Sequence, residues 1–307
     1  MPNHNIIPLF FSVDDLYAPY LAVAIQSIKE NASEDCQYNI HILVAAISEE
    51  NKRRLSAMQD GHIVIEFVDV RQQVLAMKEK LHLRDYYTLA TYYRFFISEM
   101  FPQYTRGIYL DCDIVVTGDI AELYRVDMGD RMLGAITDEV VTHNEIFSRY
   151  TKTVVGVEAQ RYFNAGVLVM NLEKMRRLDL IGAFSRMLNY RQFPVAQDQD
   201  YLNVLCFGDV HYIENTWNKT PFPDSPASTP KLIHFKLNFR PWRYTDVRFE
   251  EHFWRYARHT AYAAELLRQR ETYSAAEKER DAAQAAGLLA LAEQETAKML
   301  TAACSAH

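Results

Sequence analysis

Residues 107–118 read GIYLDCDIVVTG, an apolar run interrupted by two aspartates, Asp111 and Asp113, one residue apart. The flanking residues are β-branched or aromatic and glycines bound the run, which predicts one buried strand. Side chains alternate between the two faces of a strand, so we expect both carboxylates on one side and Cys112 on the other, as a small core residue. The stretch therefore predicts a buried strand that carries an acidic pair.

Two carboxylates on one side of a strand need a compensating cation, because each raises the pKa of the other and burial penalises both ionised forms. A divalent ion such as Mn²⁺ or Mg²⁺ supplies that charge and keeps ligand positions open for phosphate oxygens. Asp-x-Asp pairs also occur where the side chains only solvate a strand end or cap the next element. The pair is a candidate metal site that needs support from the rest of the chain.

Strands and helices alternate before this stretch. Apolar runs predict strands at 6–13, 38–44 and 63–70, and helical spacing predicts helices that end near residue 31 and cover 48–58. Alternation of this kind predicts an α/β fold with a mostly parallel central sheet flanked by helices. Ligands of such sheets gather at the carboxyl ends of the strands.

Composition excludes several classes of protein. The 307 residues carry a formal net charge of −7, which argues against a partner made of nucleic acid. Neither a GxGxxG nor a GxxxxGK[ST] sequence occurs, so a nucleotide must be held by a metal and side chains. The four cysteines lie far apart and form no CxxC, which predicts neither a zinc cluster nor a disulfide framework. No uninterrupted run of about 18 apolar residues occurs, so we expect a cytoplasmic protein, at most peripheral to the inner face of the membrane.

Polar residues stand at element ends where a ligand would lie. Asp14 follows the first strand and either accepts hydrogen bonds from a nucleoside or caps the next helix. Arg94 lies in an apolar helix predicted over 81–100, and its anionic partner is either a carboxylate or a diphosphate. Asp138 ends a further strand and either binds a sugar hydroxyl or is solvated.

The second half of the chain adds candidates of the same kind. Asn164 begins a strand and suits hydroxyl recognition or a turn. Asp198 and Gln199 open a helix, where acids ordinarily only cap. His234 ends the last short strand, and it either completes a metal shell or is structural. The proline-rich loop before it is either an acceptor-side lid or a flexible insertion.

Seven segments resemble, in order over residues 5–245, the motifs of family 8 glycosyltransferases, which include bacterial lipopolysaccharide galactosyl- and glucosyltransferases and glycogenin. They are FFSVDDLY, ATYYRF, YLDCDIVV, GAITDE, YFNAGVLVMNL, QDQDYLN and HFKLNFRPW. The resemblance implies a GT-A fold, a UDP-glucose or UDP-galactose donor, Mn²⁺ (or Mg²⁺), and transfer with retention to a saccharide or glycolipid acceptor. It also implies a role in lipopolysaccharide or cell-surface glycan synthesis.

The resemblance also implies roles for residues at matching positions. The metal is assigned to Asp111, Asp113 and His234, the uridine to Asp14 and Tyr17, the donor sugar to Arg94, Asp138, Asn164, Asp198 and Gln199, and the diphosphate to Arg240. Of the catalytic candidates Asp198 and Gln199, the amide is a poor nucleophile. We therefore expect a front-face reaction in which Gln199 stabilises the oxocarbenium-like state rather than a double displacement.

Three residues depart from the family pattern. Leu16 stands where relatives often have asparagine, which removes one hydrogen bond to the nucleoside. Leu237 and Arg240 replace the glycine and lysine of the closing His-x-x-Gly-x-x-Lys motif. Arginine keeps the charge with a different geometry, and the leucine restricts how closely the loop approaches the diphosphate.

The resemblance divides the chain into a GT-A catalytic domain, 1–245, and a helical C-terminal extension, 246–307. Aromatic and arginine residues mix over 244–262, a segment that either contacts a membrane surface or packs on the catalytic domain. Residues 265–303 are alanine-rich and charged, which predicts a helix that forms a hairpin or a weak arm for a homo-oligomer.

Two other functions compete with hexosyl transfer. Asp-x-Asp after an apolar strand also matches haloacid-dehalogenase-like phosphohydrolases, where the first aspartate is a nucleophile. That motif normally opens its domain, whereas three strands precede it here. A non-catalytic nucleotide-sugar-binding protein is the third candidate, although a pure scaffold does not need a metal triad.

Overall fold

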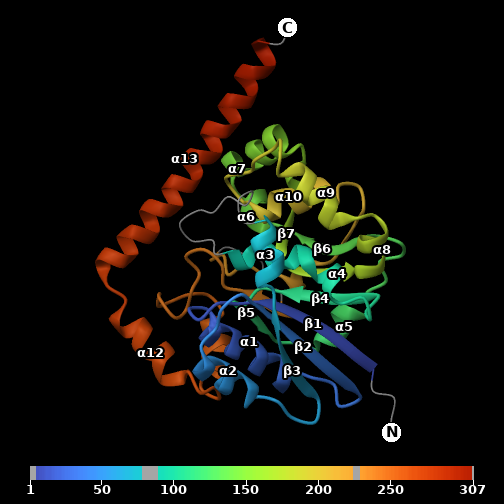
Figure 1. Cartoon of the computed structure of the whole chain (residues 1–307). Coiled ribbons are helices and arrows are strands. Elements are labelled where there is room, and N and C mark those ends of the chain that lie inside the picture. The colour runs from blue at the N-terminus through green and yellow to red at the C-terminus, as the bar shows by residue number, and fades with distance from the viewer. Residues whose placement is uncertain (1–4, 78–88, 224–228, 306–307) are drawn as a thin grey trace.

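The computed structural model of the chain describes residues 5–77, 89–223 and 229–305. A seven-stranded sheet in the order β3-β2-β1-β4-β7-β6-β8 forms its centre (Figure 1). The strands are β1 (Asn5–Ser12), β2 (Cys36–Val44), β3 (Ile63–Asp69), β4 (Arg106–Leu110), β6 (Leu133–Thr137), β7 (Phe163–Asn171) and β8 (Val210–Tyr212). A second sheet pairs β5 (Ile114–Val116) with β9 (Leu232–His234).

The central sheet is mostly parallel, as predicted, with one exception. β7 runs antiparallel to both of its neighbours, β4 and β6. The beginning of β7 therefore lies beside the end of β4, and Val167 pairs with Leu110 there. Polar residues at the start of β7 consequently reach the same edge as the residues that follow β4.

The prediction of one strand through the acidic pair was wrong. β4 ends at Leu110 and β5 begins at Ile114, and the two strands belong to different sheets. The break has a backbone cause, because the chain changes partners between the aspartates. The Asp111 N–H donates to the Gly166 carbonyl, whereas the Asp113 carbonyl accepts from the Phe235 N–H, each at 2.8 Å. Cys112 is buried, as predicted.

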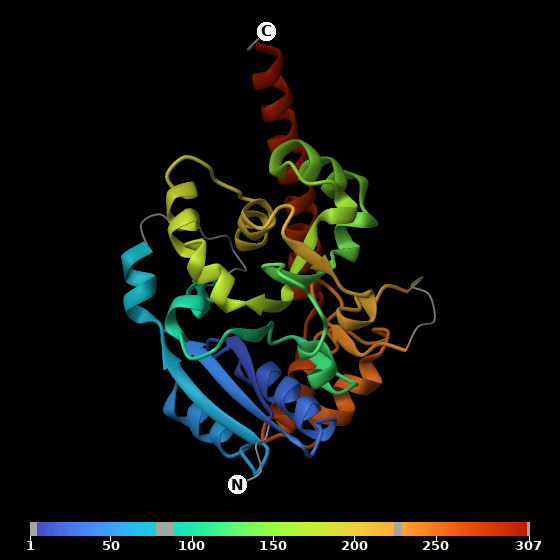
Figure 2. The same ribbon diagram turned by 90° about the vertical axis from the view of Figure 1, so that its right-hand side faces the viewer.

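Helices cover both faces of the central sheet (Figures 1 and 2). The α-helices are α1 (Ala18–Glu30), α2 (Glu49–Ser56), α3 (Arg71–Met77), α4 (Ile97–Met100), α5 (Ile120–Tyr124), α6 (Glu139–Thr142), α7 (Glu145–Tyr150), α8 (Leu172–Arg177), α9 (Leu180–Met187), α10 (Asp198–Leu205), α11 (Glu250–Ala257), α12 (Ala263–Thr272) and α13 (Ala275–Ser305). Short turns of 3₁₀- or π-helix are η1 (Leu89–Phe96), η2 (Thr151–Val155), η3 (Ala159–Arg161) and η4 (Asn215–Trp217). Two apolar clusters fill the space on the two sides of the sheet.

The α-helix expected over 81–100 is only partly present. Residues 81–88 lie outside the described part of the chain, and the next eight residues form the 3₁₀-helix η1. Nearly every η1 side chain is buried, including Arg94. A segment buried on almost all sides is shaped by its contacts more than by its helix propensity.

The C-terminal segments form three helices. Phe253, Tyr256 and Tyr262 are each 1% exposed, so the aromatic residues of 244–262 pack on the body. The helix expected over 265–303 is interrupted at Tyr273 and Ser274, between α12 and α13. It is not a hairpin, because α13 runs on along the body and projects beyond it (Figures 1 and 2). Within the described ranges no helix combines the length and apolarity that crossing a membrane requires.

Candidate active site

A cavity of about 510 Å³ opens where β1 and β4 end and β7 begins. Ser12 at the end of β1 and Asp14 and Tyr17 after it line the cavity, and so do Asp111 and Asp113 after β4. The sequence candidates converge here from separate elements. The cavity is lined by all eleven of them: Asp14, Tyr17, Arg94, Asp111, Asp113, Asp138, Asn164, Asp198, Gln199, His234 and Arg240.

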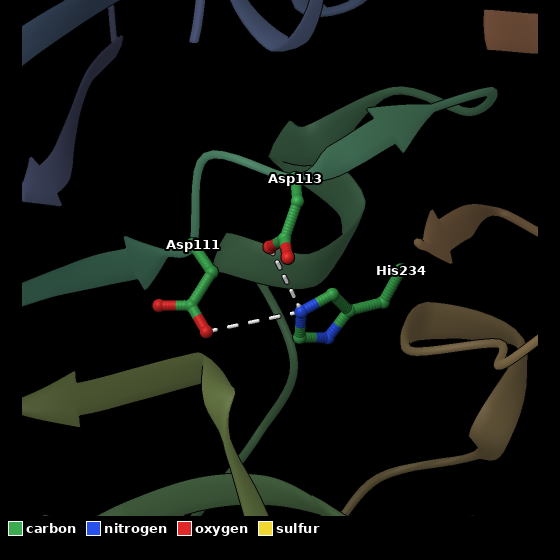
Figure 3. A group of neighbouring side chains, drawn as sticks. All are labelled: Asp111, Asp113 and His234. Atoms are coloured by element: carbon green, nitrogen blue, oxygen red, sulfur yellow. Dashed lines mark hydrogen bonds and ion pairs between the residues drawn. The ribbon is translucent and has the colours of Figure 1, made fainter. Parts of the chain in front are cut away.

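Three metal-ligand side chains meet in this cavity (Figure 3). The His234 Nε2 atom lies 3.1 Å from an Asp113 oxygen and 3.8 Å from an Asp111 oxygen. One ligand atom from each residue lies within 4.8 Å of the other two. His234 comes from β9, and the pairing of β9 with β5 brings it opposite the aspartates. This set of oxygen and nitrogen atoms fits a divalent cation.

A hydrogen-bond network fixes the orientation of the histidine. The Asn164 side-chain oxygen accepts from the Gly166 N–H at 3.0 Å and from the Asn218 amide at 2.9 Å. The Asn218 oxygen then lies 2.9 Å from His234 Nδ1, which suits an Nδ1–H donor. That tautomer leaves the lone pair of Nε2 facing the two carboxylates, the arrangement that a metal-binding histidine needs. Asn218, in the loop before β9, was missed by the sequence reasoning because nothing in its local sequence marks it.

Gly166 is the residue that lets this group assemble. A Cβ atom at this position would lie 2.4 Å from both an Asp111 oxygen and the His234 Cε1 atom. Any other side chain would displace one of the two ligands. The backbone of β7 therefore approaches the two ligands closely at this glycine.

Arg94 pairs with carboxylates, which is one of the two anionic partners expected from the sequence; the other was a diphosphate. Its guanidinium lies 3.0 Å from Asp111 and 3.2 Å from Asp198, and it stacks 4.3 Å from the ring of Tyr109. It also donates to the Ala165 carbonyl. Burial raises the pKa of Asp198 to about 7, against the opposing charge of Arg94. Arg94 thus links the proposed metal ligand to a catalytic candidate.

A second network surrounds Gln199. Its side-chain oxygen accepts from the Asn164 amide and from the Ala165 N–H, each at 3.0 Å, and its amide donates to Asp138 at 3.2 Å. Asp138 is 4% exposed, so it is not solvated, and it also accepts from Lys236 at 3.1 Å. Although burial acts in the other direction, the Lys236 charge holds the pKa of Asp138 below its usual value. Lys236 was missed in the sequence, two positions after His234.

Arg240 is a half-buried cation that lines the cavity. Its Nε–H is buried and has no hydrogen-bond partner within the part of the chain that the structure describes. Burial opposes its charge, whereas Tyr17 and Asp113 raise its pKa. An anionic group placed between Arg240 and the metal ligands would satisfy this donor. Asp14, at the same end of the cavity, accepts from the Tyr17 N–H at 3.1 Å in the turn before α1, a helix whose N-cap residue is Tyr17 and which has no side-chain cap.

The pattern of the family described as Glycosyl transferase family 8 matches residues 8–246. The chain belongs to glycosyltransferase family 8. A putative glycosyltransferase of Haemophilus influenzae is 33% identical over 232 residues, which are 75% of this chain and 68% of that protein. The lipopolysaccharide 1,3-galactosyltransferase of Salmonella typhimurium is 26% identical over 191 residues, which are 58% of this chain and 53% of that protein.

A solved structure agrees with this assignment. The galactosyltransferase LgtC, in complex with donor and acceptor sugar analogs, superimposes with a TM-score of 0.69 at 29% identity and covers 83% of this chain and 96% of its own. The GT-A fold predicted from the sequence is therefore confirmed. Glycosyltransferases of this fold use nucleotide-sugar donors and a divalent metal, which the Asp111, Asp113 and His234 group fits. The family assignment also argues against the alternative of a haloacid-dehalogenase-like phosphohydrolase.

Leu237, which stands where the family motif resembled by this sequence has a glycine, has an unfavourable backbone conformation. Leu237 has a φ of +56°, in the left-handed region that disfavours side chains with a Cβ atom. We expect Leu237→Gly to raise the free energy of unfolding by about 1 kcal/mol, because it relieves this strain. Urea unfolding would measure the change. Leu16→Gly is the matched control, since Leu16 is 76% exposed and has no positive φ; equal or greater stabilisation there would contradict the account.

Asp200, on the buried side of α10, predicts a pH dependence. Its carboxylate is 0% exposed and accepts from Tyr150 at 2.8 Å, Tyr162 at 2.6 Å and the Ala196 N–H at 3.0 Å. Burial raises its pKa from 3.8 to about 6. The folded state holds this proton when the unfolded chain has released it, so the free energy of unfolding falls as the pH rises through that interval.

The test is urea unfolding at about pH 4.5 and about pH 7. The free energy of unfolding of the wild type should fall between these two pH values. In Asp200→Asn this decrease should be smaller by about 2 kcal/mol, at about 1.4 kcal/mol per pKa unit. Asp130→Asn, at a side chain 79% exposed, should leave the fall unchanged. An identical fall in wild type and Asp200→Asn would contradict the assignment.

Proposed function

We propose that the protein is a retaining hexosyltransferase that moves glucose or galactose from a UDP-sugar to a saccharide or glycoconjugate acceptor, with Mn²⁺ (or Mg²⁺) as cofactor. The observation that carries this proposal is the meeting, in one cavity, of a three-residue metal group and Arg240, whose buried Nε–H has no hydrogen-bond partner among the described residues. A metal and a cation side by side are what a diphosphate leaving group requires. The similarity to a lipopolysaccharide galactosyltransferase supports a role in cell-surface glycan synthesis.

Asp111, Asp113 and His234 would hold the metal. When bound, the ion supplies positive charge to the diphosphate oxygens as the bond to the sugar breaks. Arg240 adds a second, fixed positive charge beside Asp113. Burial of these groups strengthens their effect, because charges interact more strongly away from water. Asp14 and Tyr17, at the same end of the cavity, are proposed to contact the uridine.

The contacts of Asp198 and Gln199 support a front-face reaction. Asp198 is paired with Arg94, and the Gln199 oxygen already accepts two hydrogen bonds. Both groups are thereby weakened as nucleophiles and held rigidly. Gln199 would then orient its amide dipole toward the charge that develops on the sugar, while Asp138 and Asn164 bind sugar hydroxyls. A glycosyl adduct trapped on Asp198 or Gln199 would overturn this route.

The experiment that tests the function is release of UDP from a panel of UDP-sugars, with Mn²⁺ and with EDTA. Metal-dependent release from UDP-glucose or UDP-galactose would support the proposal and identify the donor. Binding of UDP without release from any sugar, with or without a panel of saccharide acceptors, would instead indicate a non-catalytic nucleotide-sugar-binding protein.

Arg240 predicts a difference between two nucleotides. Arg240→Met should weaken UDP binding by about 10- to 100-fold, because a charge-assisted contact to phosphate contributes about 1.5–3 kcal/mol. UMP binding should change much less, since UMP lacks the second phosphate. Titration calorimetry with Mn²⁺ measures both affinities. Equal losses for UDP and UMP would show that Arg240 does not address the diphosphate.

A further inference from the structure

The C-terminal helix α13 lines the same cavity as the donor-site residues. Gln284, Ala285, Leu288 and Leu289 contribute to its wall. This helix lies wholly outside residues 8–246, the part of the chain that matches the family. Its contribution to the cavity is therefore a property of this chain that the family assignment does not describe.

Two buried anchors hold α13 across the cavity. At one end, Asp281 is 7% exposed and accepts from Tyr244 and Tyr273 at 2.8 Å, and it pairs with Arg243 at 3.2 Å. This anchor joins α13 to the segment that carries Arg240. At the other end, Ala292 is 0% exposed, in the part of the helix that packs on α7 and η2.

The cavity-lining residues lie between these anchors. Eleven residues separate Asp281 from Ala292, which is roughly 16 Å of helix at 1.5 Å per residue. Figures 1 and 2 show the helix passing the α7 end of the body before it projects away. The helix thus forms one side of the cavity rather than a free arm.

The residues that α13 adds to the cavity are mostly apolar, in contrast to those of the donor side. Val141 of α6 belongs to the buried apolar cluster against which Phe147 of α7 and Leu288 pack, and all three line the cavity together with Leu289. The carboxylate of Asp281 is already occupied by its three partners, which leaves Gln284 as the polar side chain that α13 offers. A surface built for sugar hydroxyls would need more hydrogen-bonding groups.

We propose that α13 forms the acceptor-side wall of the catalytic cavity and that Leu288 and Leu289 receive an apolar group, an alkyl or aryl aglycone, attached to the acceptor sugar. The inference rests on the proposed hexosyl transfer, because it takes the other half of the cavity as the donor site. It assigns the acceptor to a chemical class, glycosides with an apolar aglycone. Free saccharides would occupy the cavity without using this wall.

The test compares the binding of octyl and methyl β-glucosides and β-galactosides, below the micelle concentration, with UDP and Mn²⁺ present. An octyl glycoside should bind at least about tenfold more tightly than its methyl counterpart, because two or more buried CH₂ groups give that ratio. Saturation-transfer NMR should show contact with the octyl protons. Equal binding of octyl and methyl glycosides, or no binding of either, would overturn the proposal.

Matched variants locate the effect on the helix. Replacing both Leu288 and Leu289 by glutamine should reduce the octyl preference to near unity, whereas Leu300→Gln, on the projecting part of α13 and 54% exposed, should keep it. The double alanine variant, which favours the helix, checks that loss of preference is not loss of folding. Equal losses in the Leu300 variant would contradict the assignment. Titration of UDP in the same samples separates the two proposals: absent UDP binding refutes the donor site, and intact UDP binding without an octyl preference refutes the acceptor wall alone.

Discussion

Asp113→Ala should lower the rate of UDP release from the donor sugar by about 1,000-fold, since a metal contributes several kcal/mol of charge stabilisation in the transition state. Asp113 contacts His234 directly at 3.1 Å, and it interacts with the charge of Arg240. Its loss removes one of three ligand groups and also leaves the positive charge of Arg240 less compensated. The rate is measured with saturating Mn²⁺ and donor.

The control for this variant is Asp130→Ala, at a side chain 79% exposed that pairs with Lys174 and Arg177 on the surface. This substitution also removes one aspartate side chain, but at a residue that does not line the cavity. Its rate should equal that of the wild type. A folded Asp113→Ala protein with more than about a tenth of the wild-type rate would contradict the proposed metal role, because losing a residue that only supports a metal ligand already costs about 10- to 100-fold.

Gly166→Ala should lower the rate by about 10- to 100-fold, because disturbing the groups that orient metal ligands typically costs that much in metal affinity or activity. The added methyl group would stand 2.4 Å from atoms of Asp111 and His234, so one of them must move. We expect the apparent affinity for Mn²⁺ to fall with the rate. Titration of activity against Mn²⁺ measures both effects.

Gly118→Ala provides the matched control. A Cβ atom at Gly118 would lie 3.6 Å from the Lys231 side chain, an ordinary contact, at the far end of β5. Its rate and its Mn²⁺ dependence should match those of the wild type. If Gly166→Ala folds and keeps full activity at low Mn²⁺, the tight packing around the ligands has no functional role.

The sequence predicted the alternation of strands and helices well because local signals define it. The Ser48 hydroxyl accepts from the Asn51 N–H at the start of α2, and Asp119 caps α5 in the same way. Such caps depend on a few neighbouring residues and need no tertiary information. The same holds for the alternating apolar residues of β2.

The errors arose where distant contacts decide the structure. The break between β4 and β5 depends on Gly166 and Phe235, which pair with the backbone of the two aspartates from elsewhere in the chain. The antiparallel direction of β7 cannot be read from its own residues either. It is this direction that brings Asn164 to the cavity, a placement that a parallel strand would not have given.

The sequence predicted which residues line the candidate site better than it predicted the hydrogen bonds between them. The motif resemblance named eleven residues, and the structure places all of them on one cavity. Asn218 and Lys236, which orient His234 and Asp138, were missed because their partners lie far away in sequence. The leucines of α13 that line the cavity were missed for another reason, because they carry no motif. The individual roles of the site residues and the division at 245/246 stay predictions.

The central claim is that one cavity binds a divalent metal and a nucleoside diphosphate together. Calorimetric titration of UDP into the protein, once with Mn²⁺ and once with EDTA, tests it most directly. We expect UDP to bind in Mn²⁺ and to bind about 100-fold or more weakly in EDTA, since several kcal/mol of charge stabilisation depend on the ion. Asp113→Ala should weaken UDP binding by the same factor with Mn²⁺ present. UDP binding of equal strength in Mn²⁺ and EDTA, or an Asp113→Ala protein that binds UDP like the wild type, would contradict it.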